Sequence, residues 1–124
     1  MRLAGYGPNG ANQIREMADP RTKAGFPIIL AMDGYHNIKK NVQYPPVILR
    51  VGLNDKRVPP WETAKFGARL QASDTRQPVL VRVEVNAGHG IGSTSDQHAN
   101  ERADMMAFFL ERFGHEDFKP VTTK

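Results

Sequence analysis

The sequence predicts an α/β fold in which two parallel strands pair and helices flank them. Two short apolar runs, PPVILRV at 45–51 and PVLVRVEV at 78–85, are typical of buried strands. The stretch between them, PWETAKFGARLQA at 60–72, has the spacing and the length of a helix. Two strands joined by such a helix form a parallel right-handed crossover, and strands as apolar as these indicate helices on both faces of the sheet.

The residues before the first strand show weaker patterns. Residues 1–18 are rich in glycine and asparagine and are expected to form a loop. Asp19 followed by Pro20 is typical of a helix start, and we expect Pro27 to break that helix near its middle. We therefore divide the chain into an N-terminal loop segment (1–18), a single α/β domain (19–114) and a C-terminal tail (115–124).

The two later helices are amphipathic. In the helix at 60–72, the apolar face holds Trp61, Ala64 and Ala68, with Phe66 and Leu70 beside it. The last helix, SDQHANERADMMAFFLERFG at 95–114, is the clearest in the chain, with Ser95 or Asp96 as its cap and Gly114 as its end. Its core stripe is expected at Ala99, Ala103, Met106, Leu110 and Phe113, and its solvent side at Glu101, Asp104 and Glu111.

Composition argues against several classes of function. The net charge of +4 comes from 17 Lys and Arg against 13 Asp and Glu, but the basic residues occur singly or in pairs, so no nucleic-acid partner is expected. The chain has no cysteine, which excludes disulfides and thiol catalysis. No apolar run approaches the roughly 20 residues of a membrane span, and the N-terminus has no hydrophobic signal core. We expect a cytoplasmic protein that binds no membrane.

Two loops at the carboxyl ends of the expected strands carry the residues best suited to chemistry. GLNDKRVPP follows the first strand and NAGHGIGS follows the second. Because ligands of parallel sheets bind beyond the carboxyl ends of the strands, Asp55 and His89 are expected to emerge side by side. A carboxylate that accepts the Nδ1 proton of an imidazole leaves Nε2 free as a general base. In a plainer interpretation, Asp55 caps the helix that starts near Pro60 and His89 merely turns the chain.

Three segments together resemble a known family. YPPVILRVGLNDKRVPPWETAKFGARLQA, PVLVRVEVNAGHGIGS and ERADMMAFFLERF are similar to the carboxyl-terminal end of the prolyl oligopeptidase family of serine peptidases, and the similarity extends over residues 7 to about 114. The resemblance implies part of an α/β-hydrolase fold, peptide bond hydrolysis as the activity, and no cofactor. Through the D-x-R-V and A-G-H-G signatures it implies that Asp55 and His89 are the triad aspartate and histidine, and that Arg57 contacts a backbone carbonyl of the substrate.

The nucleophile that this resemblance requires has no counterpart in the sequence. The family serine lies in an upstream G-x-S-x-G turn, whereas these 124 residues contain only Ser73, Ser93 and Ser95, none of them in that pattern. Ser93, in a loose loop near His89, is a poor substitute. The first hypothesis is therefore a truncated hydrolase module whose site is completed by an amino-terminal partner fragment.

Two further hypotheses remain open. The chain could be an orphan hydrolase of activated esters or phosphoesters with a bound zinc or other divalent metal, because a carboxylate often holds the second nitrogen of a metal-ligating histidine. His89, His98 and Asp96 are the candidate ligands, although no H-x-x-x-H or H-E-x-x-H spacing is present. The other hypothesis is a non-catalytic interaction module.

Two strands are too few for a stable sheet. In the fold that the resemblance implies, another strand covers the first strand of this chain, and nothing before Pro45 has the length and β-branched content to replace it. An open strand edge templates association. We therefore expect a homodimer or higher oligomer in which the edge at 45–51 pairs with its two-fold mate, antiparallel by symmetry.

Overall fold

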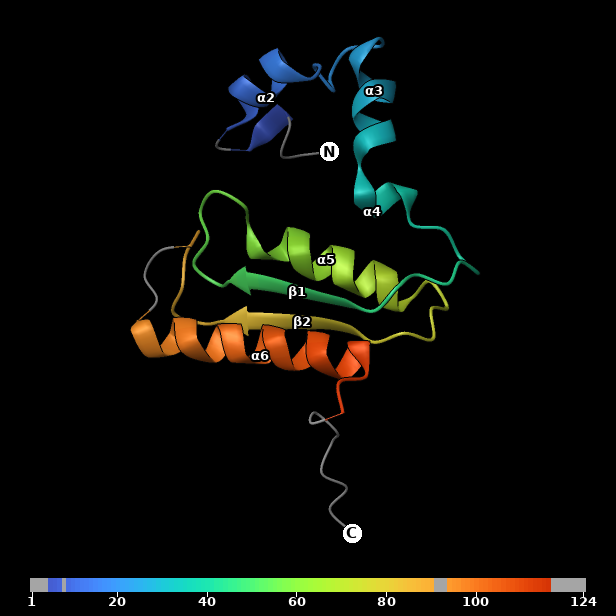
Figure 1. Cartoon of the computed structure of the whole chain (residues 1–124). Coiled ribbons are helices and arrows are strands. Elements are labelled where there is room, and N and C mark those ends of the chain that lie inside the picture. Colours follow the sequence, from blue (N-terminus) through green and yellow to red (C-terminus); the bar gives the residue numbers. More distant parts are fainter. Residues whose placement is uncertain (1–4, 8, 91–93, 117–124) are drawn as a thin grey trace.

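The computed structural model describes residues 5–7, 9–90 and 94–116 (Figure 1). Figure 1 shows two strands side by side between two helices, with the N-terminal helices gathered to one side of this unit. In chain order the elements are α2 (Gly10–Glu16), α3 (Gly25–Met32), α4 (Gly34–Asn37), β1 (Val47–Gly52), α5 (Pro60–Gln71), β2 (Val79–Glu84) and α6 (Ser95–Phe113).

β1 and β2 form a parallel pair, which confirms the predicted topology. Their register runs from Val47 opposite Val79 to Gly52 opposite Glu84, and α5 is the crossover between them. Within the described part of the chain the sheet has these two strands and no third. Because the strands point the same way, the loops that follow them leave the sheet at one edge (Figure 1).

α5 packs closely on one face of the sheet. At Gly67 a Cβ atom would meet the side chain of Val81 at 2.6 Å and that of Leu49 at 3.2 Å, so glycine lets the helix approach the strands. The face expected at Trp61, Ala64 and Ala68 is exposed instead, because this contact turns the helix the other way. The core beneath α5 is small and consists of Ile38, Leu70 and Val79, with Tyr44, Val47 and Phe66 packed around them.

α6 covers the opposite face. Successive strand residues point to opposite faces, so Arg50 and Arg82 face away from α5, and both reach acidic residues of α6. Glu101, expected in solvent, pairs with Arg50 and has a side chain only 15% exposed. Asp104 pairs with Arg82 at 2.7 Å. The charged side of α6 therefore faces the strands, because the strands present arginines to it.

As a consequence, the predicted core stripe of α6 is wrong. Phe108 is the buried residue of this helix, whereas Met106 is 60% exposed and Phe113 is 81% exposed. Ala99 and Ala103 are exposed as well.

The ends of α6 follow ordinary capping rules. Thr94, rather than Ser95 or Asp96, is the cap: its side chain accepts the N–H of Gln97, and the Gln97 side chain accepts the N–H of Thr94. Ser95 is already the first helical residue, so its hydroxyl is one position too late. Gly114 ends the helix in the left-handed conformation, as predicted.

The N-terminal third departs from the expected pattern. Residues 10–16, expected as loop, form the helix α2. Asp19 caps a turn through Arg21 and Thr22, and α3 begins only at Gly25. Pro27 is the third residue of α3 and does not break it, since the first turn of a helix needs no bonded N–H.

No helix in the described ranges is long and apolar enough to cross a membrane. Most of the segment assigned as the C-terminal tail, residues 117–124, lies outside the described residues.

Candidate active site

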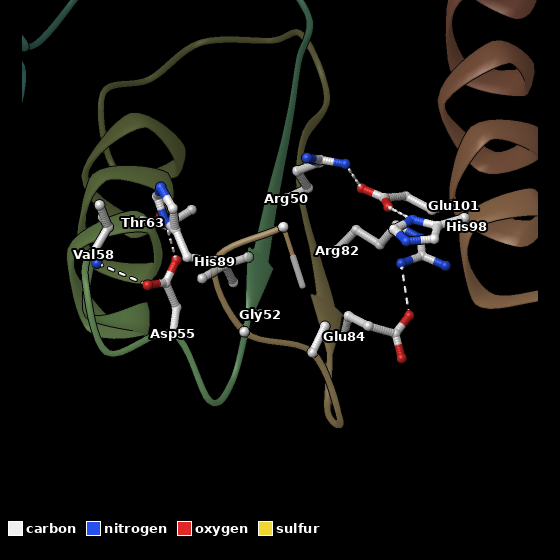
Figure 2. A pocket seen from close by; sticks show the side chains of 14 residues that line it. Arg50, Gly52, Asp55, Val58, Thr63, Arg82, Glu84, His89, His98 and Glu101 are labelled. Carbon is white, nitrogen blue, oxygen red and sulfur yellow. Dashed lines mark hydrogen bonds and ion pairs between the residues drawn. The ribbon is translucent and has the colours of Figure 1, made fainter. Parts of the chain in front are cut away.

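Asp55 and His89 meet beyond the carboxyl ends of the two strands. His89 Nδ1 lies 2.7 Å from Asp55 Oδ2 (Figure 2). The other carboxylate oxygen, Oδ1, accepts the backbone N–H groups of Arg57 and Val58, each at 2.8 Å. The Asp55 side chain is only 9% exposed, whereas that of His89 is 43% exposed. The carboxylate is thus held from three sides, and the imidazole faces outward from it.

These contacts set the charge on Asp55. Burial opposes ionisation, but the hydrogen bonds from Val58, His89 and Arg57 outweigh it, and the pKa of Asp55 is lowered. The side chain is therefore a carboxylate at neutral pH and accepts a hydrogen bond from the Nδ1–H of His89. Among the described residues Nε2 of His89 has no hydrogen-bond partner. This arrangement leaves Nε2 as an oriented base that can take a proton from a hydroxyl or from water.

A cavity of about 310 Å³ opens beside the Asp–His pair. His89 and Asp55 line it together with Thr63 of α5. On its far side lie charged residues from both strands and from α6, which Figure 2 shows paired with one another. These lining residues are Arg50, Arg82, Glu84, His98 and Glu101.

The charged wall of the cavity was not foreseen from the sequence. Arg50 and Arg82 lie directly opposite each other in the register of the sheet, so two like charges are neighbours. Glu101 and Asp104, one helical turn apart on α6, each pair with one of them. The signal that could have revealed this wall was a single arginine three residues after the first valine of each apolar run, Arg50 after Val47 and Arg82 after Val79.

The other predicted site residues lie in different places. The backbone N–H of Arg57 supports Asp55, but its exposed side chain is not among those lining the cavity. Ser73 is buried, with its hydroxyl 2.6 Å from the carbonyl oxygen of Leu70. Ser95 begins α6, and Ser93 lies outside the described residues.

The geometry lends no support to the metal hypothesis. His98 lines the same cavity as His89, but Asp96 does not. In the ranges that the structure describes, no group of three or more His, Asp or Glu side chains is placed to hold a metal ion.

Comparison with known proteins assigns the chain to a family. Residues 9–116 match the model of the prolyl oligopeptidase family. The chain belongs to this family. It is 37% identical to a prolyl endopeptidase from Elizabethkingia miricola over 99 residues, which are 79% of this chain and 14% of the relative. It is 36% identical to dipeptidyl aminopeptidase BI from Pseudoxanthomonas mexicana over 108 residues, which are 86% of this chain and 15% of the relative.

Solved structures of prolyl oligopeptidase-type enzymes share the fold. Prolyl oligopeptidase B from Galerina marginata superposes with a TM-score of 0.81 at 25% identity, covering 90% of this chain and 16% of that one. Oligopeptidase B from Leishmania major superposes with a TM-score of 0.78 at 23% identity, covering 85% of this chain and 15% of that one. The predicted partial α/β-hydrolase fold is confirmed, and the chain corresponds to about a seventh of each whole enzyme.

Proposed function

We propose that this chain supplies the histidine base and its orienting aspartate to a serine-type peptidase site. The observation that supports this most directly is the 2.7 Å contact between His89 Nδ1 and Asp55 Oδ2, with two backbone N–H groups on Oδ1. An isolated capping aspartate would not require the histidine of a different loop, 34 residues further on. The plainer interpretation is therefore the weaker one.

In this proposal each group has one task. Asp55 accepts a hydrogen bond from the Nδ1–H of His89. Its negative charge stabilises the imidazolium that forms when Nε2 accepts the proton of the attacking hydroxyl. His89 then returns that proton to the leaving amine. Arg57 projects into solvent from the residues that carry Asp55, where its guanidinium can donate to a backbone carbonyl of a bound peptide.

The attacking hydroxyl comes from polypeptide outside these residues. Neither Ser73 nor Ser95 is placed for the reaction, since Ser73 is buried just after α5 with its hydroxyl bonded to the carbonyl oxygen of Leu70, and Ser95 begins α6. The relatives are several times longer than this chain, which leaves ample polypeptide for a nucleophile and its oxyanion donors. Peptides are the proposed substrates, by analogy with the Galerina enzyme, which was solved bound to 35mer and 25mer substrates.

Fragment complementation tests the proposal. The chain is mixed with the part of the Elizabethkingia prolyl endopeptidase that precedes the matched region, and release of nitroaniline from a proline-containing peptide is followed. We expect turnover only in the mixture, and a loss of about 10²-fold to 10⁴-fold with either His89→Ala or Asp55→Asn. Arg57→Ala should raise KM more than it lowers kcat.

His36→Ala is the matched control. His36 also contacts an aspartate, Asp33, at 3.0 Å, but it does not line the cavity. This variant should retain full activity. Turnover in the mixture that survives His89→Ala would overturn the proposal, and so would an inactive mixture whose two fragments are shown to bind each other.

We also propose that the chain alone associates with a second copy through the open edge of β1. In the described residues β1 pairs with β2 alone, so no strand covers its other edge. Pairing with a second copy and docking of the remaining catalytic domain would compete for the same strand edge. If the fragment mixture showed no peptidase activity, the remaining hypothesis would be a non-catalytic role in assembly.

A further inference from the structure

Asn54 bridges the two loops that carry Asp55 and His89. Its backbone N–H donates to the carbonyl oxygen of Ala87 at 3.0 Å, and its side-chain Nδ2 donates to that of Val85, also at 3.0 Å. Residues 85 and 86 form the turn that follows β2. Asn54 thus holds both sides of this turn, two to four residues before His89, and is itself the neighbour of Asp55.

The same two loops approach closely at Gly52. A Cβ atom there would lie 2.5 Å from the carbonyl oxygens of both Ala87 and Gly88, so only a residue without a side chain fits. The Gly88 carbonyl also accepts the N–H of Gly90 at 2.9 Å, which folds the chain around His89 in a three-residue turn. The close approach of Gly52, at the end of β1, therefore fixes the position of the turn that carries His89.

We propose that Asn54 is a positioning residue, which fixes the separation of Asp55 and His89 by fastening the second loop to the first. A 2.7 Å contact between side chains on two loops requires that the loops keep their spacing, and one side chain binds across it. A substitution at Asn54 should therefore disturb the Asp55–His89 contact without changing either of those two residues. This inference rests on the proposed function, since it assigns how that Asp–His pair is held.

Asn86 provides a matched comparison. It lies in the same turn, is exposed like Asn54, and its side chain makes no hydrogen bond among the described residues. Removing either side chain removes one exposed amide from the same loop pair. Only Asn54→Ala removes a bond that joins the loops.

The test reads the state of the His89 ring and needs no activity. In the 124-residue chain with ¹⁵N-labelled histidine, above the pH at which imidazole is protonated, the ¹⁵N shifts of the two ring nitrogens report which one carries the proton. The ring in the parent is expected mainly in the Nδ1–H form. In Asn54→Ala the ratio of Nε2–H to Nδ1–H should rise about twofold to tenfold, the range set by loss of one exposed hydrogen bond. Asn86→Ala should leave the ratio unchanged.

Asp55→Asn is the reference and should shift the ring to the Nε2–H form. If Asp55→Asn shifts the ring and Asn54→Ala does not, the positioning role is wrong while the Asp–His pair stands. If Asp55→Asn has no effect, the pair itself fails, and with it the proposed function. A shift in Asn86→Ala as large as in Asn54→Ala would show general loosening of the loop and would also refute the role.

Discussion

At the scale of single residues, the surroundings of an Asp–His contact decide what it can do. Within the described residues there are two such contacts, at 2.7 Å between Asp55 and His89 and at 3.0 Å between Asp33 and His36. Asp33 caps α4 and meets a histidine of the same short helix. Asp55 instead meets a histidine from another strand end, beside a cavity. Of the two pairs only Asp55 and His89 line this cavity, so theirs is the contact that we propose to orient a base.

The lowered pKa of Asp55 makes the stability of the fold depend on pH. A carboxyl whose folded pKa lies below its unfolded value, about 3.9, stabilises the fold above that value and loses this contribution as pH falls through the folded pKa. We therefore expect the urea midpoint of the parent to fall between about pH 5 and pH 3. Asp55→Asn should show a weaker fall, measured by circular dichroism.

The pH dependence of the parent has to be compared with that of Asp55→Asn, because Asp55 is not its only source. The pKa of Asp33 is also lowered, to about 2, so Asp33 adds to the loss of stability at low pH. Identical pH slopes for the parent and Asp55→Asn would show that Asp55 is not held as a stabilised carboxylate.

At the scale of elements, the two helices hold the sheet by different chemistry. α5 packs on it through close apolar contact at Gly67 and Leu70. α6 meets it through ion pairs of Arg50 and Arg82 as well as through the buried Phe108. Exposed ion pairs contribute little stability each, about 0–1 kcal/mol, and salt screens them. The ion pairs of Arg50 and Arg82 with α6 should therefore weaken at high salt, whereas the apolar contact of α5 should not.

Gly67→Ala tests the tighter contact. The new methyl group would lie 2.6 Å from the Val81 side chain, so either α5 or the strand must shift. We expect a loss of about 1–3 kcal/mol in the free energy of unfolding, measured by urea denaturation, despite the higher helix propensity of alanine. Ala64→Ser, on the exposed face of the same helix, should stay within about 0.5 kcal/mol. A stabilised Gly67→Ala variant would contradict this packing.

At the scale of the whole molecule, several large apolar side chains are exposed around a small core. The buried core has few residues, while Met106 and Phe113 on α6 and Leu80 on β2 are 60%, 81% and 48% exposed. Large apolar side chains that are exposed in one chain become buried where other protein packs on them. This exposure supports the proposal that further protein packs on this chain.

Self-association should therefore be measurable and should depend on the edge of β1. Val47 and Leu53 donate their N–H groups to β2, so the alternate residue Ile48 directs its own toward the open edge. Sedimentation velocity at micromolar concentration should show a dimer that Ile48→Pro converts to monomer. Val47→Pro should instead destabilise the fold itself, because its N–H bonds to Pro78 at 2.9 Å. A parent that sediments as a monomer would refute the proposed pairing.

The pairing of β1 with β2 and the presence of Asp55 and His89 at one edge could be derived from sequence. Apolar runs of strand length, a helix between them and loops rich in glycine are local patterns, and parallel topology follows from them by general rules. The end of α6 at Gly114 was equally local, since a left-handed residue ends a helix wherever it occurs.

Which face of each later helix meets the sheet was decided by tertiary structure. The apolar pattern of α6 pointed to Met106 and Phe113, but the strands offer arginines on that side, and Glu101 and Asp104 turn toward them. The orientation of α5 depended on Gly67, a residue without a side chain to signal it. The bond from Asn54 to Val85 likewise joins residues 31 positions apart. Hydrophobic periodicity describes one element by itself, whereas charge pairing and close backbone approach depend on two elements at once, so only the folded chain could reveal them.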